Sequence, residues 1–143
     1  MRMLSRVLTL GVVAVCVLAW SPVLAQSEEA EKKAVAAATA WLALVDAGRY
    51  AESWDAAAVY FKNAVSQDNW VKMLEGARKP LGKLVSRKLA AKKYATSLPG
   101  APDGQYVVIQ FSAEFAAKAK AVETIAPMLD PDGVWRVSGY FFK

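Results

Sequence analysis

The chain has 143 residues with 18 basic and 13 acidic side chains, no histidine and one cysteine, and its formal net charge is +5. Without histidine, a Ser-His-Asp triad and a Cys-His pair are excluded, and a zinc site would have to rely on oxygen ligands, which is unusual. The eight glycines are scattered and form no phosphate-binding motif.

The N-terminal segment has the layout of a secretory signal. Two arginines precede the apolar run Val7–Trp20, and Val23-Leu24-Ala25 supplies the small or modest side chains expected before a cleavage site. An uncleaved membrane anchor is the alternative, but the run is shorter than the ~20 residues of a spanning helix. We predict a signal peptide over 1–25, cleaved after Ala25 together with Cys16, a single domain over 26–143, and a periplasmic or secreted location.

Three helical segments are predicted between the cleavage site and Gly82. Ser27 can cap the first, which ends at Gly48, the second starts near Arg49, and Ser66 can cap the third, which ends at Pro80-Leu81-Gly82. Apolar residues at helical spacing are expected to be buried: Val35, Ala38, Trp41, Leu42 and Val45, then Tyr50, Trp54, Ala57 and Ala58, then Trp70, Val71, Met73, Leu74 and Ala77.

After Gly82 the hydrophobic period changes from about 3.6 to about 2, which predicts strands over 83–94, 104–115, 119–129 and 134–142. The second strand alternates most clearly, with Val107, Ile109, Phe111, Ala113 and Phe115 on its apolar face. This order of elements predicts an α+β domain, in which three N-terminal helices pack on a curved four-stranded antiparallel sheet.

The last hairpin has turn chemistry at Asp130-Pro131-Asp132-Gly133. Pairing Asp130 with Gly133 places an apolar set on one face, which we expect to be the core side: Met128 with Trp135, Ala126 with Val137, Thr124 with Gly139, and Val122 with Phe141. The other face then receives Pro127 with Arg136, Ile125 with Ser138, and Glu123 with Tyr140.

A set of motifs runs through nearly the whole of 26–143: Trp41-Leu42, Asp46, Gly48, Tyr50, Ser53-Trp54, Trp70, Arg78, Pro80-Leu81-Gly82, Arg87, Pro102-Asp103-Gly104-Gln105-Tyr106, Phe111, Phe115, Lys118, Glu123 and Gly133 to Tyr140. Their order and spacing resemble domain-of-unknown-function family 4019, which comprises uncharacterised bacterial exported proteins. The resemblance implies a cone-like fold similar to nuclear transport factor 2 or cystatin. It implies no activity and no catalytic residues, because such cones include enzymes and binding domains alike.

Polar strand residues form the first candidate ligand site, namely Arg87, Glu114, Glu123, Arg136 and Tyr140. On a face that lines the mouth of the cone they would make a polar pocket for a small anionic or amphipathic ligand. On the outer face they would be solvated, and Glu114 and Glu123 would pair across the strands with Lys118, Lys120 and Arg136. The hairpin register favours the outer face.

Tyr50 and Trp54 are the candidates for the rim of a cavity, because they lie between helices and carry polar groups. The other large aromatic residues are assigned to the core: Trp41, Phe61, Trp70, Phe111, Trp135 and Phe141. Asp46 and Asp55 are expected to face water.

The segment Arg78–Lys93 carries seven basic residues and no acidic one. It could be attracted to an anionic envelope surface or polymer. We favour instead a lysine-protected edge strand that resists aggregation. Nucleic acid is not an expected partner, because no aromatic platform interleaves with these charges.

These observations favour an exported, non-catalytic module that binds a small ligand or an envelope protein, with no cofactor, no metal and no membrane span beyond the signal. The alternative is a small cone-fold isomerase, lyase or hydrolase that uses carboxylate, arginine and tyrosine groups. A homodimer through the sheet face is a third expectation, since Ile125, Tyr140 and Phe142 would add apolar area there.

Overall fold

The computed structural model describes residues 21–143. In chain order it contains α1 (Pro22–Asp46), α2 (Tyr50–Asp55), α3 (Val59–Ala64), α4 (Gln67–Ala77), a short 3-10 helix η1 (Lys79–Leu81), and the strands β1 (Leu84–Ala95), β2 (Tyr106–Phe115), β3 (Lys118–Leu129) and β4 (Trp135–Phe142). The predicted α+β class is confirmed. The predicted signal peptide lies outside the described residues except for 21–25, most of which form the first turn of α1.

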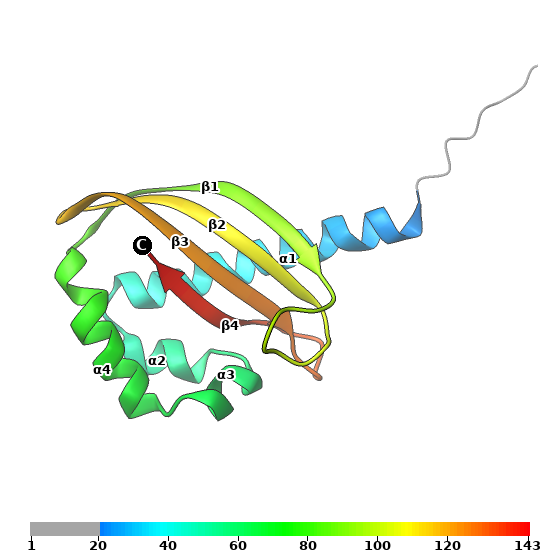
Figure 1. Ribbon diagram of the computed structural model, residues 1–143, viewed down its shortest axis with the longest axis horizontal. Helices are drawn as coiled ribbons and strands as arrows, with labels where there is room; N and C mark the ends of the chain where they lie inside the picture. The colour runs from blue at the N-terminus through cyan, green and yellow to red at the C-terminus, as the bar shows by residue number, and fades with distance from the viewer. Residues whose placement is uncertain (1–20) are drawn as a thin grey trace, which may run out of the picture.

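Helix α1 is the main cover of the sheet. It contacts all four strands, and Figure 1 shows it running along one side of the curved sheet while its N-terminal turns extend beyond it. Its buried stripe is Ala30, Ala34, Ala38, Trp41, Leu42 and Val45. Small alanines make up the N-terminal half of this stripe, and larger residues make up its C-terminal end.

The second predicted helix ends at Asp55, before Ala57 and Ala58, and the separate helix α3 that follows it was not predicted. The break falls at Ala57 and Ala58, and the Ala58 amide donates to the carbonyl of Val137 in β4 over 2.8 Å. A tertiary hydrogen bond therefore interrupts a segment whose side-chain spacing alone reads as continuous. In the third predicted helix, α4, Ser66 accepts from the Asn69 amide as expected.

The sheet is a meander in the order β1-β2-β3-β4, with antiparallel neighbours throughout. The predicted apolar face of β2 is confirmed, since Val107, Ile109, Phe111, Ala113 and Phe115 are all buried while Gln110, Ser112 and Glu114 are exposed. Strand β1 forms one edge of the sheet and is exposed over most of its length.

The predicted register of the last hairpin is wrong. The Asp130 amide donates to Val134, and Gly133 has φ +82°, so the turn holds one more residue than predicted. Leu129 therefore faces Trp135, and an irregularity after Ile125 adds a further shift that brings Ile125 opposite Tyr140 and Thr124 opposite Phe141.

The two shifts together restore the predicted grouping of side chains beyond the irregularity, but the face that packs on the helices there is the one predicted to point outward. Nearer the turn, Val137 is buried as predicted. Glu123, Ile125 and Tyr140 face the helices and are 0%, 0% and 7% exposed, whereas Phe141 points outward and is 68% exposed. The apolar area expected on the outer face from Ile125 and Tyr140 is thus in the core, and the assignment of Phe141 to the core is wrong.

The space between helices and sheet is filled by side chains. Trp41 contacts Tyr140 edge-on with ring centroids 5.4 Å apart, and Trp70 contacts Phe61 in the same way at 4.9 Å. These aromatic pairs join α1, α3, α4 and β4 into one core. Met73, predicted to be buried, is 58% exposed because it lies on the side of α4 away from this core. Between residues 21 and 143, no helix combines the length and the apolar character that crossing a membrane requires.

Candidate functional site

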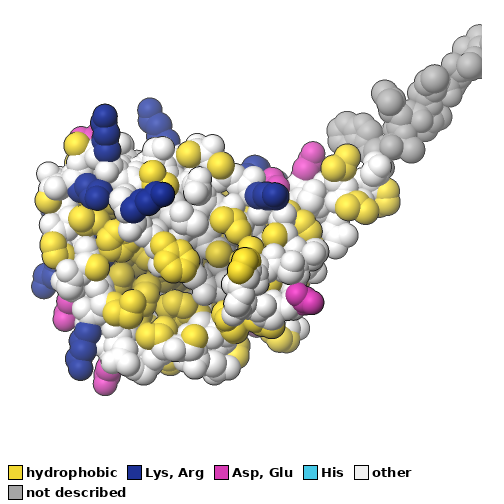
Figure 2. Space-filling view, in the orientation of Figure 1, with side chains coloured by type: hydrophobic (Ala, Val, Ile, Leu, Met, Phe, Trp, Pro, Cys, Tyr) yellow, Lys and Arg dark blue, Asp and Glu magenta, His cyan; other side chains and the backbone are white. Residues whose placement is uncertain are grey.

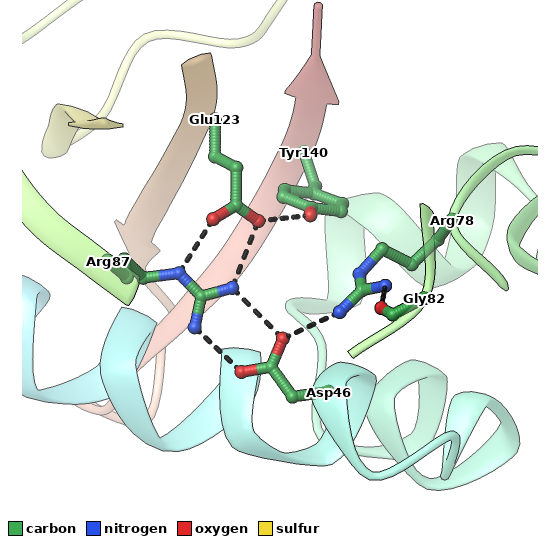
Figure 3. Close-up of polar contacts among 6 residues, drawn as sticks. All are labelled: Asp46, Arg78, Gly82, Arg87, Glu123 and Tyr140. Carbon is green, nitrogen blue, oxygen red and sulfur yellow. Dashed lines mark hydrogen bonds and ion pairs between the residues drawn. The ribbon is translucent and has the colours of Figure 1, made fainter. Parts of the chain in front are cut away.

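A buried network of charged side chains joins five elements of the fold (Figure 3). Its centre is Arg87 of β1, whose guanidinium makes two hydrogen bonds to Asp46 at the end of α1, at 2.7 and 3.0 Å. The same guanidinium makes two more to Glu123 of β3, at 2.6 and 3.1 Å. Arg87 therefore binds two carboxylates bidentately, which is the strongest geometry available to a guanidinium.

Two further residues complete the network. Arg78, at the C-terminus of α4, donates to Asp46 over 3.1 Å and to the carbonyl of Gly82 over 2.8 Å. Its guanidinium also lies 4.3 Å from the ring centroid of Phe115, so a buried cation has an aromatic neighbour as well as its carboxylate. The Tyr140 hydroxyl donates to Glu123.

The network holds two arginines and two carboxylates, so its formal charges cancel. Glu123 is completely buried, and the side chain of Arg78 is 3% exposed. Burial alone lowers the pKa of Arg87, but the hydrogen bonds and charges of Asp46 and Glu123 outweigh it, and the net shift is upward. Burial, then the charge and hydrogen bond of Glu123, raise the pKa of Tyr140, so this side chain stays a neutral donor.

Each member of the network is placed by the local geometry of its element. Asp46 follows Ala38 and Leu42 at intervals of four residues along the buried stripe of α1, and Arg78 follows Trp70 and Leu74 in the same way on α4. Arg87 faces inward beside Ala113, whose small side chain leaves room for the guanidinium.

A second set of hydrogen bonds fixes the helices around this network. Ser53 is completely buried, its carbonyl accepts from the indole of Trp41 at 2.7 Å, and its hydroxyl accepts from the indole of Trp70 at 3.0 Å. The same hydroxyl donates to the carbonyl of Tyr50. One serine therefore ties α1, α2 and α4 together and satisfies two buried indoles.

An open hollow of about 410 Å³ adjoins the network between the α1–α2 turn and the α4–β1 connection. Its lining residues are Asp46, Ala47, Gly48, Tyr50, Glu75, Arg78, Lys79, Gly82 and Lys83. Asp46 is neutralised by the two arginines, so Lys79 and Lys83 against Glu75 leave an excess of one positive charge. The hollow is thus a polar, mildly basic depression with one wall formed by the network.

The structure separates the seven predicted site residues. Arg87, Glu123 and Tyr140 converge, on the helix-covered face rather than the outer face favoured by the predicted register. Tyr50 is buried in the core and is one of the residues that line the hollow. Trp54 is half-buried, and its indole donates to the carbonyl of Val65, so it joins α2 to the end of α3 away from the hollow.

Glu114 and Arg136 lie apart from the network. Glu114 is exposed on the outer face of β2. Arg136 donates to Asp130 and Asp132, both at 2.9 Å, and so braces the turn between β3 and β4. The hydrogen bond from Arg136, followed by that from the Val134 amide, lowers the pKa of Asp132.

Two members of the network were not predicted as site residues. Asp46 was expected to face water. This expectation is wrong, because two guanidiniums bind its carboxylate and its side chain is only 20% exposed. Arg78 was assigned only to a basic run. In both cases a charged residue continues an apolar stripe at four-residue spacing, and this signal could have identified them.

A family model with the description "Protein of unknown function (DUF4019)" matches residues 37–140. The match covers more than two thirds of the chain and spans every element from the second half of α1 into β4, including all five members of the network. No curated protein and no solved structure matches the chain.

Proposed function

We propose that this protein, which belongs to the DUF4019 family, is an exported, non-catalytic domain that binds a small anionic or amphipathic ligand in the hollow beside the charged network. The observation that carries the proposal is that the buried charges are bonded to one another, while the charged groups of the hollow remain open to solvent. The network then serves as a rigid wall of the binding site.

Binding is favoured over acid–base chemistry by the state of the carboxylates. Both oxygens of Glu123 already accept hydrogen bonds, one from Arg87 alone and one from Arg87 and Tyr140. Both oxygens of Asp46 are occupied by arginines. A general acid or base must reach its substrate directly or through one water, and carboxylates held in this way would first have to break bidentate pairs.

The chemistry of the hollow favours an anionic group on the ligand. Lys79 and Lys83 are exposed at its edge and can turn toward a carboxylate or phosphate, while Ala47 and the small exposed part of Tyr50 add apolar surface beside them. A ligand with one acidic group and a small apolar body would satisfy both parts.

Export is supported by the position of the core relative to the predicted cleavage site. Between Ser21 and the core, the first buried residue is Ala30. Cleavage after Ala25 would therefore remove exposed helical residues and leave the packed interior unchanged. We also propose that the arch of sheet and helices is a cone similar to nuclear transport factor 2.

A thermal-shift screen of the exported protein against small carboxylic acids, phosphate esters and cell-wall fragments tests the binding proposal. A ligand that binds the folded state raises the unfolding temperature according to its concentration relative to its Kd. We expect this shift to be lost in Lys83→Ala and retained in Lys72→Ala, which removes an exposed lysine of α4 outside the hollow. If no ligand raises the unfolding temperature, or if Lys83→Ala responds like the unchanged protein, the hollow is not the binding site.

A further inference from the structure

We propose that the outer face of the sheet docks on an anionic lipid surface. This face is the side of the four strands that carries no helix, and its exposed residues include Lys88, Gln110, Ser112, Glu114 and Phe141. The proposal does not depend on the hollow described above, which lies on the helix-covered side of the sheet, beside the α1–α2 turn.

The strand register assembles this face from residues that are distant in sequence. Lys88 of β1 pairs with Ser112 of β2, Ser112 pairs with Val122 of β3, and Val122 exchanges two backbone hydrogen bonds with Lys143. One row across the sheet thus has a lysine at each end. With strands about 4.8 Å apart, these two lysines lie roughly 14 Å from each other across small side chains.

The charges on this face are largely of one sign. Lys88, Lys93, Lys120 and Lys143 are exposed there, against a single acidic residue, Glu114. Within residues 21–143 none of these four lysines takes part in an ion pair. In Figure 2, dark-blue side chains project along the upper margin over the strands, whereas blue and magenta alternate at the lower left.

This basic face differs from the basic run seen in the sequence. Arg78 and Arg87 of that run are enclosed in the buried network, and Lys92 turns toward Glu31 of α1 at 3.4 Å. Lys88 and Lys93 remain on the outer face, and they are joined there by lysines from β3 and from the end of β4. The basic residues of the run therefore do not act together, and the basic face is formed by lysines that strand pairing brings side by side.

An exposed aromatic side chain identifies a lipid surface as the occupant. Phe141 is 68% exposed and lies over Gly139, on the same face as Lys143, which directly follows β4. Lysines around an exposed phenylalanine match an interface in which headgroup phosphates meet the edge of the hydrocarbon layer. A soluble acidic polymer would use the lysines but would leave Phe141 without a partner.

Cosedimentation of the exported protein with lipid vesicles tests the proposal. We compare vesicles of equal parts phosphatidylglycerol and phosphatidylcholine with vesicles of phosphatidylcholine alone, at low and high salt. The variant K88Q/K120Q/K143Q is matched by K32Q/K33Q/K72Q, which removes the same charge from helices α1 and α4, and F141S tests the aromatic residue. All these positions are exposed, and equal unfolding temperatures show that each variant is folded.

We expect binding to the anionic vesicles that is weakened by salt. Each lysine removed from the face should reduce partitioning about fivefold, so the triple variant should bind about a hundredfold more weakly, while the helix variant should change little. F141S should reduce partitioning several-fold on the same vesicles. The proposal is overturned by equal binding of the two triple variants, by equal binding to neutral vesicles, by capture on dextran sulfate without vesicle binding, or by a dimer that F141S dissociates.

Discussion

Replacing Arg87 by methionine tests whether the charged network holds the sheet to the helices. Methionine keeps the length and the apolar stem of arginine but removes all four hydrogen bonds to Asp46 and Glu123. Glu123 is 0% exposed and would keep only the hydroxyl of Tyr140 as a partner. The variant therefore leaves a buried carboxylate without a compensating cation.

The size of the effect follows from this burial. Breaking a buried ion pair by removing one partner costs about 3–5 kcal/mol, much of it the desolvation of the remaining charge. Domains of this size are stable by about 5–15 kcal/mol, so Arg87→Met removes a large share of the free energy of unfolding. At about 3–5 °C per kcal/mol, the unfolding temperature should fall by roughly 10–20 °C.

Urea unfolding followed by tryptophan fluorescence measures this loss, because Trp41 and Trp70 lie in the core beside the network. The matched control is Lys88→Met at the next position of β1, where the side chain is exposed and the change should stay within about 0.5 kcal/mol. The double variant R87M/E123Q should be more stable than the sum of the two single effects predicts, by about 0.5–3 kcal/mol.

Two outcomes would refute this account of the network. One is an Arg87→Met variant that unfolds at the same urea concentration as Lys88→Met. The other is that the loss of stability in R87M/E123Q equals the sum of the losses in the two single variants, because this would mean that Arg87 and Glu123 do not interact. Either result would mean that the apolar core alone joins α1 to β1 and β3.

Three further predictions concern single features of the fold. The pKa of Tyr140 is raised in the folded state, so the stability that this side chain contributes is fully present below its unfolded pKa of about 10 and is lost as the pH rises beyond that value. Above pH ~10, the free energy of unfolding, measured with urea, should therefore fall more steeply in the unchanged protein than in Tyr140→Phe. Gly82→Ala should destabilise more than Gly48→Ala in a thermal melt, because both glycines have positive φ but only at Gly82 would the new Cβ meet Ala116 at 3.2 Å; equal losses would contradict this. A chain that begins at Gln26 should keep the unfolding temperature of a chain that begins at Ser21, since the buried residues of α1 begin at Ala30, and a clear fall on calorimetry would assign a stabilising role to 21–25.

The four strands and the start of α4 could be predicted because they depend on short-range patterns. The alternation of β2 and the cap at Ser66 each involve residues within a few positions of one another, and both are confirmed. The division between α2 and α3 could not be predicted in this way, because it depends on a hydrogen bond from Ala58 to Val137, far along the chain.

The sequence by itself determined that helical segments precede four strands and that consecutive strands pair as neighbours, because hydrophobic period and turn residues act locally. Only the tertiary structure decided which faces of β3 and β4 look inward. A glycine at φ +82° in the last turn and an irregularity after Ile125 each shift the register by one residue, and the two shifts cancel in their effect on the faces, so Glu123 and Tyr140 share a face as the sequence predicts. That face is nevertheless the inner one, because Arg87 compensates the buried carboxylate of Glu123. The charged network depends on that outcome, because Arg87 meets Asp46 and Glu123 across separations of 41 and 36 residues that no local pattern records.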